Sequence, residues 1–179
     1  MPFKRFGSDS DFAPDALVIF ENFGLAIYIA QLFERDLQVA MTGLERLNLL
    51  PLPPDIRRST DRIVDECLGP MLRALQAEGL IEPKISRFLQ KAQHCRNELV
   101  HRFMAENVLD MLNAAGRAAV NDRLYRLFST LFRAQNVVSQ LRDQVWARLG
   151  LPREQIDRQI KEWQQISDTS PQDLDDETA

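Results

Sequence analysis

The sequence predicts an all-α protein, an antiparallel helical bundle of about five helices with flexible termini. Seven glycines in 179 residues and nine clustered prolines leave long stretches free of residues that break helices. Apolar residues recur every three or four positions along several of these stretches, which is the spacing of one helix face. The apolar share of 45% is typical of a globular domain, so the chain is expected to fold around a core.

The first helix is expected to begin near Pro14, because proline suits the first turn of a helix. Its apolar stripe continues to Leu47, and the proline-rich segment 50–54 must end it. The stripe contains Ile19, Phe23, Ala26, Ala30, Phe33, Leu37, Ala40, Leu44 and Leu47. Phe20 and Met41 widen this stripe, which predicts contact with neighbours on more than one side.

Two further helical stretches are expected before the last one. The first covers roughly 59–77, with a break or kink at Gly69-Pro70 and a stop at Gly79. The second covers about 82–103, and residues 107–116 form a short fourth helix or its continuation.

The last long helix has the most regular apolar pattern in the chain. Its apolar residues alternate steps of three and four positions: Val120, Leu124, Leu127, Leu131, Ala134, Val138, Leu141 and Val145. Such a heptad-like seam predicts packing against other helices at a shallow crossing angle. Gly150-Leu151-Pro152 should end this helix, and residues 153–166 are expected to form one more amphipathic helix.

Charge and composition divide the chain into three parts. Residues 1–13 are expected to be a flexible lead-in, 14–167 the helical bundle domain, and 168–179 a disordered acidic tail. The tail holds five acidic residues and no basic one. Removing these five from the 26 acidic residues leaves 21 against 22 basic ones, so the net charge of −4 belongs to the tail.

The cysteines and the apolar runs bear on location. Cys67 and Cys95 form neither a disulfide framework nor a metal site by their spacing, so buried free thiols are expected. No secretory signal is visible, and the most apolar run, residues 22–33, is short for a membrane span. We therefore expect a cytoplasmic protein with no membrane contact, no cofactor and no metal.

Candidate chemistry is concentrated on the third predicted helix. Both histidines of the chain, His94 and His101, lie there. Asn97 precedes His101 by four positions, so their side chains share a helix face. Arg96 precedes it by five, about 140° around the helix and about 7.5 Å along it. A single copy is therefore not expected to form a tight Arg–His pair, although Arg96 is long enough to curl towards the side of the histidine. A symmetric dimer would present both residues twice in one cleft.

These residue types suit cleavage of RNA without a metal. Histidine can accept and donate a proton near neutral pH, and arginine can hold a phosphate and stabilise added negative charge. Asn97 can orient the imidazole or bind a phosphate oxygen. Together they match transesterification, in which the ribose 2′-hydroxyl attacks its own phosphate. The sequence offers no obvious carboxylate cluster for a two-metal mechanism.

The segment Arg96-Asn97-x-x-x-His101 resembles the R-x4-6-H signature of the HEPN superfamily, including the polar residue after the arginine. The text of residues 68–101 also looks like the helices that lead into this motif in small bacterial members, and the architecture of residues 15–150 is similar. The resemblance implies a homodimeric, metal-independent endoribonuclease of toxin–antitoxin, stress or phage-defence systems. It implies catalytic roles for Arg96 and His101, an assisting role for Asn97, an RNA substrate, and an antitoxin or regulatory partner.

The sequence departs from the family at one position. Some members carry a tyrosine two residues after the histidine, where a partner nucleotidyltransferase modifies its hydroxyl. The residue here is Phe103, so control by that route is not expected.

Other readings of the same residues stay open. Arg96 and His101 could lie on a solvated face or in a cluster with Glu98 and Arg102. His94, Glu98 and His101 share a helix face at spacings of four and three, which could bind zinc weakly. A row on the last helix could guide RNA or simply face water: Arg117, Arg123, Arg126 and Arg133. The alternative function is a non-catalytic, dimeric helical adaptor that binds a protein partner.

Overall fold

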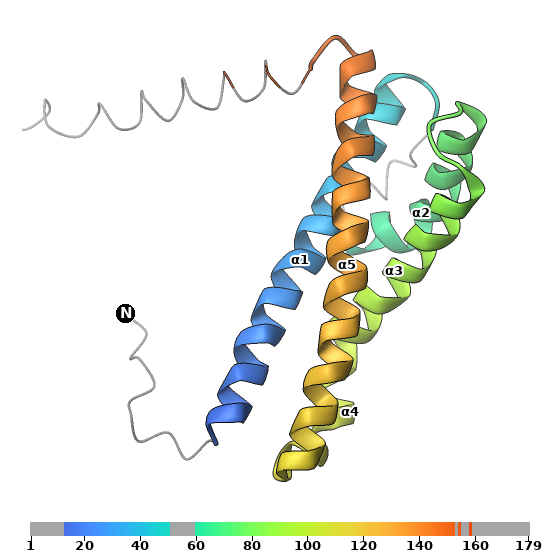
Figure 1. The fold of residues 1–179 in the computed structure, drawn as a ribbon. Helices are drawn as coiled ribbons and strands as arrows, with labels where there is room; N and C mark the ends of the chain where they lie inside the picture. Colours follow the sequence, from blue (N-terminus) through green and yellow to red (C-terminus); the bar gives the residue numbers. More distant parts are fainter. Residues whose placement is uncertain (1–12, 51–59, 153, 155–157, 159–179) are drawn as a thin grey trace, which may run out of the picture.

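The chain folds into helices throughout its described part (Figure 1). The computed structural model describes residues 13–50, 60–152, 154 and 158. Within these residues it contains five α-helices, one short 3-10 helix and no strand, which confirms the predicted all-α bundle. The elements are α1 (Pro14–Arg46), α2 (Thr60–Ala77), α3 (Pro83–His101), α4 (Phe103–Asn107), η2 (Asp110–Leu112) and α5 (Ala114–Arg148).

The two longest helices, α1 and α5, lie side by side and run in the same direction (Figure 1). Asp15 near the start of α1 contacts Arg117 near the start of α5. Towards the other end, the indole N–H of Trp146 donates to the backbone carbonyl of Val39 over 3.1 Å. This pair is therefore parallel, which differs from the antiparallel packing expected for the bundle as a whole.

Helix α3 runs antiparallel to α5. Glu98 near the end of α3 pairs with Arg123 in the first half of α5. Phe88 near the start of α3 lies under the guanidinium of Arg133, further along α5, at 5.5 Å from its ring centre. The segment with Arg96 thus contacts both long helices, through Glu34 of α1 and Arg123 of α5.

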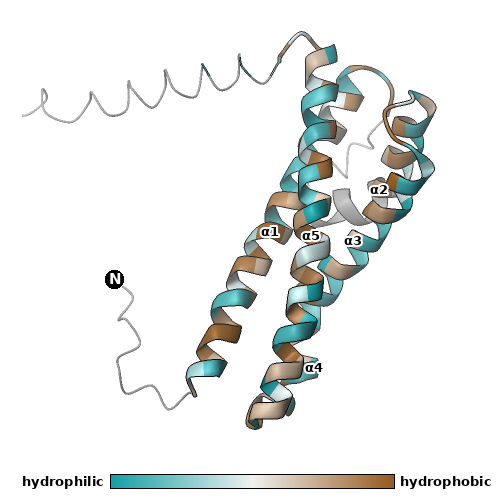
Figure 2. Cartoon of the chain, in the orientation of Figure 1, coloured by the Kyte–Doolittle hydropathy of each residue, from teal (hydrophilic) through white to brown (hydrophobic). Residues whose placement is uncertain are grey.

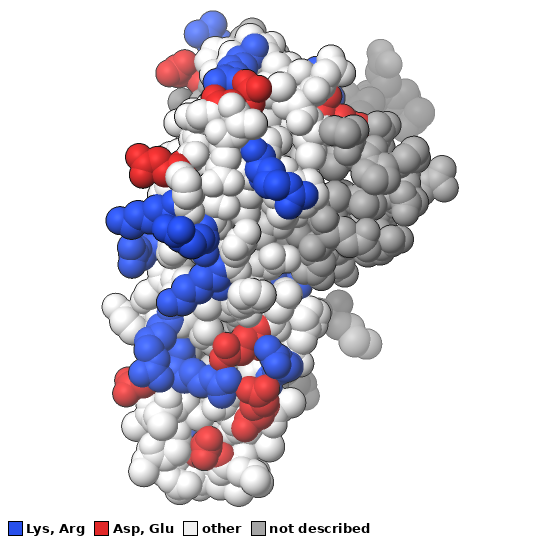
Figure 3. Space-filling view, turned by 90° about the vertical axis from the view of Figure 1, so that its right-hand side faces the viewer, with Lys and Arg blue, Asp and Glu red and all other residues white. Residues whose placement is uncertain are grey.

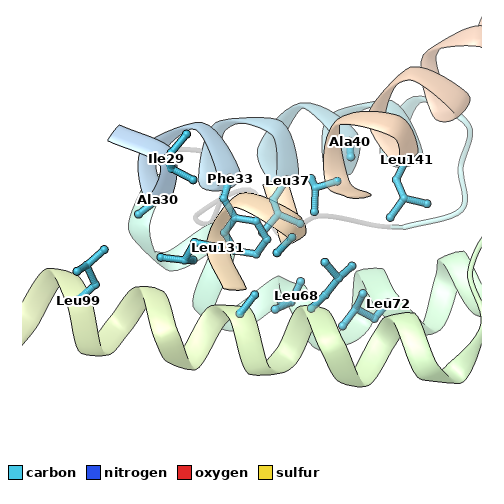
Figure 4. Close-up of a cluster of buried hydrophobic side chains, with 14 of the residues drawn as sticks. Ile29, Ala30, Phe33, Leu37, Ala40, Leu68, Leu72, Leu99, Leu131 and Leu141 are labelled. Atoms are coloured by element: carbon cyan, nitrogen blue, oxygen red, sulfur yellow. The ribbon is translucent and has the colours of Figure 1, made fainter. Parts of the chain in front are cut away.

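The core is formed by the apolar stripes that the sequence predicted (Figure 4). All eight seam residues of the last helix, from Val120 to Val145, are buried. In α1, Met41 is fully buried, but Phe20 is 39% exposed, so the expectation that Phe20 widens the buried stripe is wrong. Figure 2 shows that apolar and polar residues alternate along α1 and α5.

A close approach of α1 and α5 depends on Gly43. An added Cβ at this position would lie 2.5 Å from Cγ1 of Val145 and 3.3 Å from Nε1 of Trp146. Any larger residue would push the helices apart, because Val145 is itself fully buried. The smallest residue is therefore required here for packing, since its backbone is ordinary helix.

Helix α2 continues through Gly69-Pro70 and ends at Ala77, so the helix break that the sequence allowed at this point does not occur. The apolar residues that follow the proline, Met71, Leu72 and Leu75, are buried against the core. This packing holds the helix together across the one backbone hydrogen bond that a proline cannot make. Gly79 has a φ of +67°, as a helix stop requires.

The connection between α3 and α5 also differs from a simple short helix. Arg102, with a φ of −131°, separates α3 from α4, so the third helix ends earlier than predicted. Asn113 caps α5 by accepting the backbone N–H of Gly116 over 2.9 Å. A side chain at Gly116 would clash with the backbone of Asp110 in η2. The expected helix at 153–166 and the acidic tail lie mostly outside the described residues.

Helix α1 is long and apolar enough, by length and composition alone, to cross a membrane. Its most apolar 18-residue window has a mean hydropathy of 1.7, and one third of that window is buried in the fold. A core helix of a soluble protein has the same composition. No other described helix passes this test.

Candidate functional site

Arg96 is a buried cation, and its partners come from two helices. Only 5% of the residue is exposed. Its Nη2 forms an ion pair with the carboxylate of Glu34 on α1. Its Nη1 donates to Oδ1 of Asn97 over 2.9 Å and lies 3.2 Å from Nε2 of His101. A guanidinium taken out of water requires such compensation, because an unpaired buried charge is strongly unfavourable.

His101 is the last residue of α3, and its side chain is exposed. The guanidinium of Arg96 can only donate hydrogen bonds, so Nε2 of His101 must accept. The neutral ring therefore carries its proton on Nδ1. The arrangement places a proton-accepting imidazole at the surface, directly beside a fixed positive charge.

One chain forms the Arg96–His101 contact by itself, and the expectation that it would require a second copy is wrong. The ideal helix separates the two Cα positions by about 140°, but the arginine side chain is long enough to cover that distance. Helical side chains also lean towards the N-terminus, so His101 leans back towards Arg96. Asn97 is half-buried, and its Oδ1 contacts the same guanidinium nitrogen, Nη1, as Nε2 of His101 does.

Phe103, two residues after His101, is completely buried. Its ring stacks on Phe23 of α1 at 5.9 Å between ring centres. The guanidinium of Arg123 lies over the same ring at 5.6 Å. A side chain here is part of the core, so this position is closed to a modifying enzyme in the folded chain.

Glu98 points away from Arg96 and pairs with α5. Its carboxylate accepts from Nη2 of Arg123 over 2.6 Å and from Nε over 2.9 Å. Arg123 also pairs with Glu106 at 2.9 Å. The hydrogen bonds that Arg123 donates to Glu106 and to Glu98, named in order of size, raise the pKa of its guanidinium. Glu98, which one reading of the sequence placed in a cluster with Arg96, His101 and Arg102, thus joins Arg123 and Glu106 in a bridge between α3, α4 and α5.

The zinc reading of His94, Glu98 and His101 finds no support in the described part of the chain. No group of three or more histidine, cysteine, aspartate or glutamate side chains there is placed to hold a metal ion. Cys95 is a free, half-buried thiol, and burial followed by the charge of Glu98 raises its pKa.

On the face of the molecule that Figure 3 shows, basic side chains form a band with acidic groups among them. Lys84, Arg87 and Lys91 are exposed and follow one another along one face of α3. In the row predicted on α5, Arg117 and Arg123 are used in ion pairs with Asp15, Glu98 and Glu106. The row on α3, which the sequence analysis did not single out, is the more accessible one.

A surface pocket between α1 and α5 contains none of the predicted site residues. Its volume is about 270 Å³, and Asn22 donates to Asn121 across it over 3.0 Å. Leu25, Tyr125 and Phe128 supply most of its apolar lining. It combines no acid, base and nucleophile in one place, so the Arg96–His101 pair is the stronger candidate for chemistry.

Glu34 is the site residue that the sequence analysis missed. It lies on a different helix from Arg96 and directly follows the fully buried Phe33. The one sequence signal is an acidic residue at the edge of an apolar stripe, and that alone does not identify its partner.

Comparison with known proteins gave no match. The chain matches no family model, and no curated protein or solved structure is significantly similar to it.

Proposed function

We propose that this chain is a metal-independent endoribonuclease of the HEPN type. It acts as a homodimer in the cytoplasm, in a toxin–antitoxin, stress or phage-defence role. The observation that carries the proposal is the contact between Nη1 of Arg96 and Nε2 of His101. It joins a buried, fixed cation to an exposed imidazole that can take a proton, which are the two groups that cleavage of a phosphodiester by its own 2′-hydroxyl requires.

In the proposed reaction, a phosphate of the RNA binds Nη1 of Arg96 and replaces His101 as its hydrogen-bond partner. The released Nε2 of His101 accepts the proton of the ribose 2′-hydroxyl, and the 2′-oxygen attacks phosphorus. The bond to the 5′-oxygen breaks, and that oxygen takes a proton from His101 of the second copy, which enters the reaction as the protonated imidazolium and leaves it neutral. The products are a 2′,3′-cyclic phosphate and a 5′-hydroxyl.

The exposed residues Lys84, Arg87 and Lys91 support the choice of RNA as substrate. They lie on the same helix as His101 and provide positive charge for a phosphate backbone. Since each phosphate contact releases counterions, binding is expected to weaken as salt rises.

Cleavage of single-stranded RNA in the presence of EDTA tests the proposal. Wild type is expected to leave 2′,3′-cyclic phosphate ends, and His101→Ala is expected to cut at least about 100-fold more slowly. His94→Ala is the matched control, because His94 is an exposed histidine on the same helix. It should cut like wild type. Cleavage that requires a metal, or that His101→Ala leaves unchanged, contradicts the proposal.

A second function is favoured by a different observation. Large apolar side chains are exposed along α1 and α5, among them Leu25 at 50%, Tyr28 at 55% and Tyr125 at 69%. Such a surface suits a non-catalytic, dimeric adaptor that binds a protein partner. In that case Arg96→Ala and His101→Ala keep biological activity, whereas Tyr125→Ser abolishes it. Toxicity on overexpression that Arg96→Ala relieves favours the nuclease.

A further inference from the structure

The ion pair between Glu34 and Arg96 is almost fully desolvated. The side chain of Glu34 is 14% exposed and that of Arg96 is 6% exposed. Their neighbours along the two helices, Phe33, Leu37 and Leu99, are core residues with at most 1% exposure. The pair therefore joins α1 to α3 where water contributes little to either charge.

The two terminal nitrogens of the Arg96 guanidinium have different partners. Nη2 faces Glu34, whereas Nη1 faces Asn97 and the exposed His101. An arginine side chain has several rotatable bonds, but contacts on both edges of its planar fork leave one orientation. The carboxylate of Glu34 holds the inner edge, so the outer edge stays directed at His101.

Helix α1 carries a second carboxylate–arginine pair that provides a comparison. Asp36, two positions after Glu34, pairs with Arg142 of α5 at 2.5 Å and accepts from Gln135 over 3.2 Å. This pair also joins two helices and is also mostly buried. It has no contact with His101, so it reports on stability alone.

We propose that Glu34 is a positioning residue, which fixes Nη1 of Arg96 against Nε2 of His101. It thereby keeps a phosphate-binding edge beside the proton acceptor and holds His101 in the tautomer protonated on Nδ1. The proposal rests on the ribonuclease function proposed above, because only then does the orientation of Arg96 affect a reaction.

The kinetic test replaces Glu34 by Gln, which keeps the shape and removes the charge. Cleavage is expected to fall about 10- to 100-fold, mainly in kcat, because a displaced catalytic group slows the chemical step. Asp36→Asn is the matched control: its melting temperature should fall, but its cleavage per folded molecule should equal that of wild type. In an Arg96→Ala background, Glu34→Gln should have no further effect. Wild-type kcat in folded Glu34→Gln overturns the proposal.

If Glu34→Gln does not fold, Glu34→Asp provides the test. It keeps the charge but withdraws the carboxylate by one methylene group, and it is expected to lose several-fold in kcat. Unchanged cleavage by folded Glu34→Asp would then overturn the proposal.

A second measurement does not depend on cleavage. The ¹⁵N NMR shifts of the His101 ring report which nitrogen carries the proton, and the exposed His94 is an internal reference. In wild type, the neutral ring of His101 should be protonated on Nδ1. In Glu34→Gln, the spectrum of His101 should show a mixture of tautomers, while that of His94 stays unchanged. If this change occurs but wild type cuts no RNA, the positioning holds and the nuclease proposal fails. If His101→Ala abolishes cleavage but Glu34→Gln changes neither cleavage nor the His101 spectrum, the nuclease proposal holds and the role of Glu34 is refuted.

Discussion

Gly43 of α1 and Val145 of α5 lie so close together that no side chain fits between them. A Cβ at position 43 would approach Cγ1 of Val145 to 2.5 Å, whereas one at Gly24, on the same helix, would meet nothing within 4 Å. Helix α1 thus contains one glycine whose replacement would cause a clash and one whose replacement would not. Comparing the stability of variants at these two positions therefore measures how closely α1 and α5 approach.

We predict that Gly43→Ala lowers the free energy of unfolding by about 1–3 kcal/mol, because the added methyl group overpacks a rigid contact. Gly24→Ala should raise the free energy of unfolding by up to about 1 kcal/mol, since alanine has a higher helix propensity than glycine at an exposed position. Thermal unfolding of both variants measures the two values. A Gly43→Ala variant as stable as Gly24→Ala would show that α1 and α5 are further apart than described.

The sequence predicted the helices well because their periodicity is local. Each seam residue of α5, such as Leu131, is buried, and this follows from its spacing to the next apolar residue. The direction of α1 relative to α5 was not predictable in this way. It depends on the path that the chain takes through α2 and α3, which connect α1 to α5 in the sequence, and no local pattern records that path. For the same reason Pro70 did not break α2, since tertiary packing outweighed a local preference.

The candidate site was predictable only in part. The spacing of Arg96 and His101 marked them as a pair, but ideal helix geometry argued against contact within one chain. The arginine side chain is flexible, and its orientation is set by Glu34 on another helix. An ion pair between helices leaves no trace in the spacing of either residue, so the partner of Arg96 required the structure.

The two-sided contact of Arg96 leads to a prediction about the conservative substitution. Arg96→Lys keeps the charge but is expected to lose about 100-fold in cleavage, because a single ammonium group cannot reach Glu34 and His101 together. Arg142→Lys is the control, since Arg142 contacts Asp36 and Asp143 away from His101. It should destabilise the fold and leave cleavage per folded molecule unchanged. Full activity of Arg96→Lys would mean that charge alone is sufficient at this position.

The contact between Asp15 and Arg117 gives a prediction about pH. The carboxylate of Asp15 accepts from Nε of Arg117 over 2.7 Å, where the two long helices begin. This hydrogen bond, opposed by slight desolvation and helped by the charge of Arg117, holds the pKa of Asp15 below its usual value of 3.8. A lowered pKa in the folded state means that the unfolded chain binds the proton more readily. The contact therefore stabilises the fold above about pH 4, and its contribution is lost as the pH falls through the lowered pKa.

Comparing wild type with Asp15→Asn over this pH range tests the prediction. At neutral pH wild type should melt at a slightly higher temperature than Asp15→Asn, and the difference should be small because the Asp15 side chain is half exposed to solvent. The difference in melting temperature should shrink as the solution is acidified, and it should vanish once Asp15 is protonated in both the folded and the unfolded state. Glu21→Gln, which removes an exposed carboxylate further along α1, should show no comparable loss on acidification. A margin between wild type and Asp15→Asn that is independent of pH would assign the effect to packing at the start of α1 rather than to the ion pair.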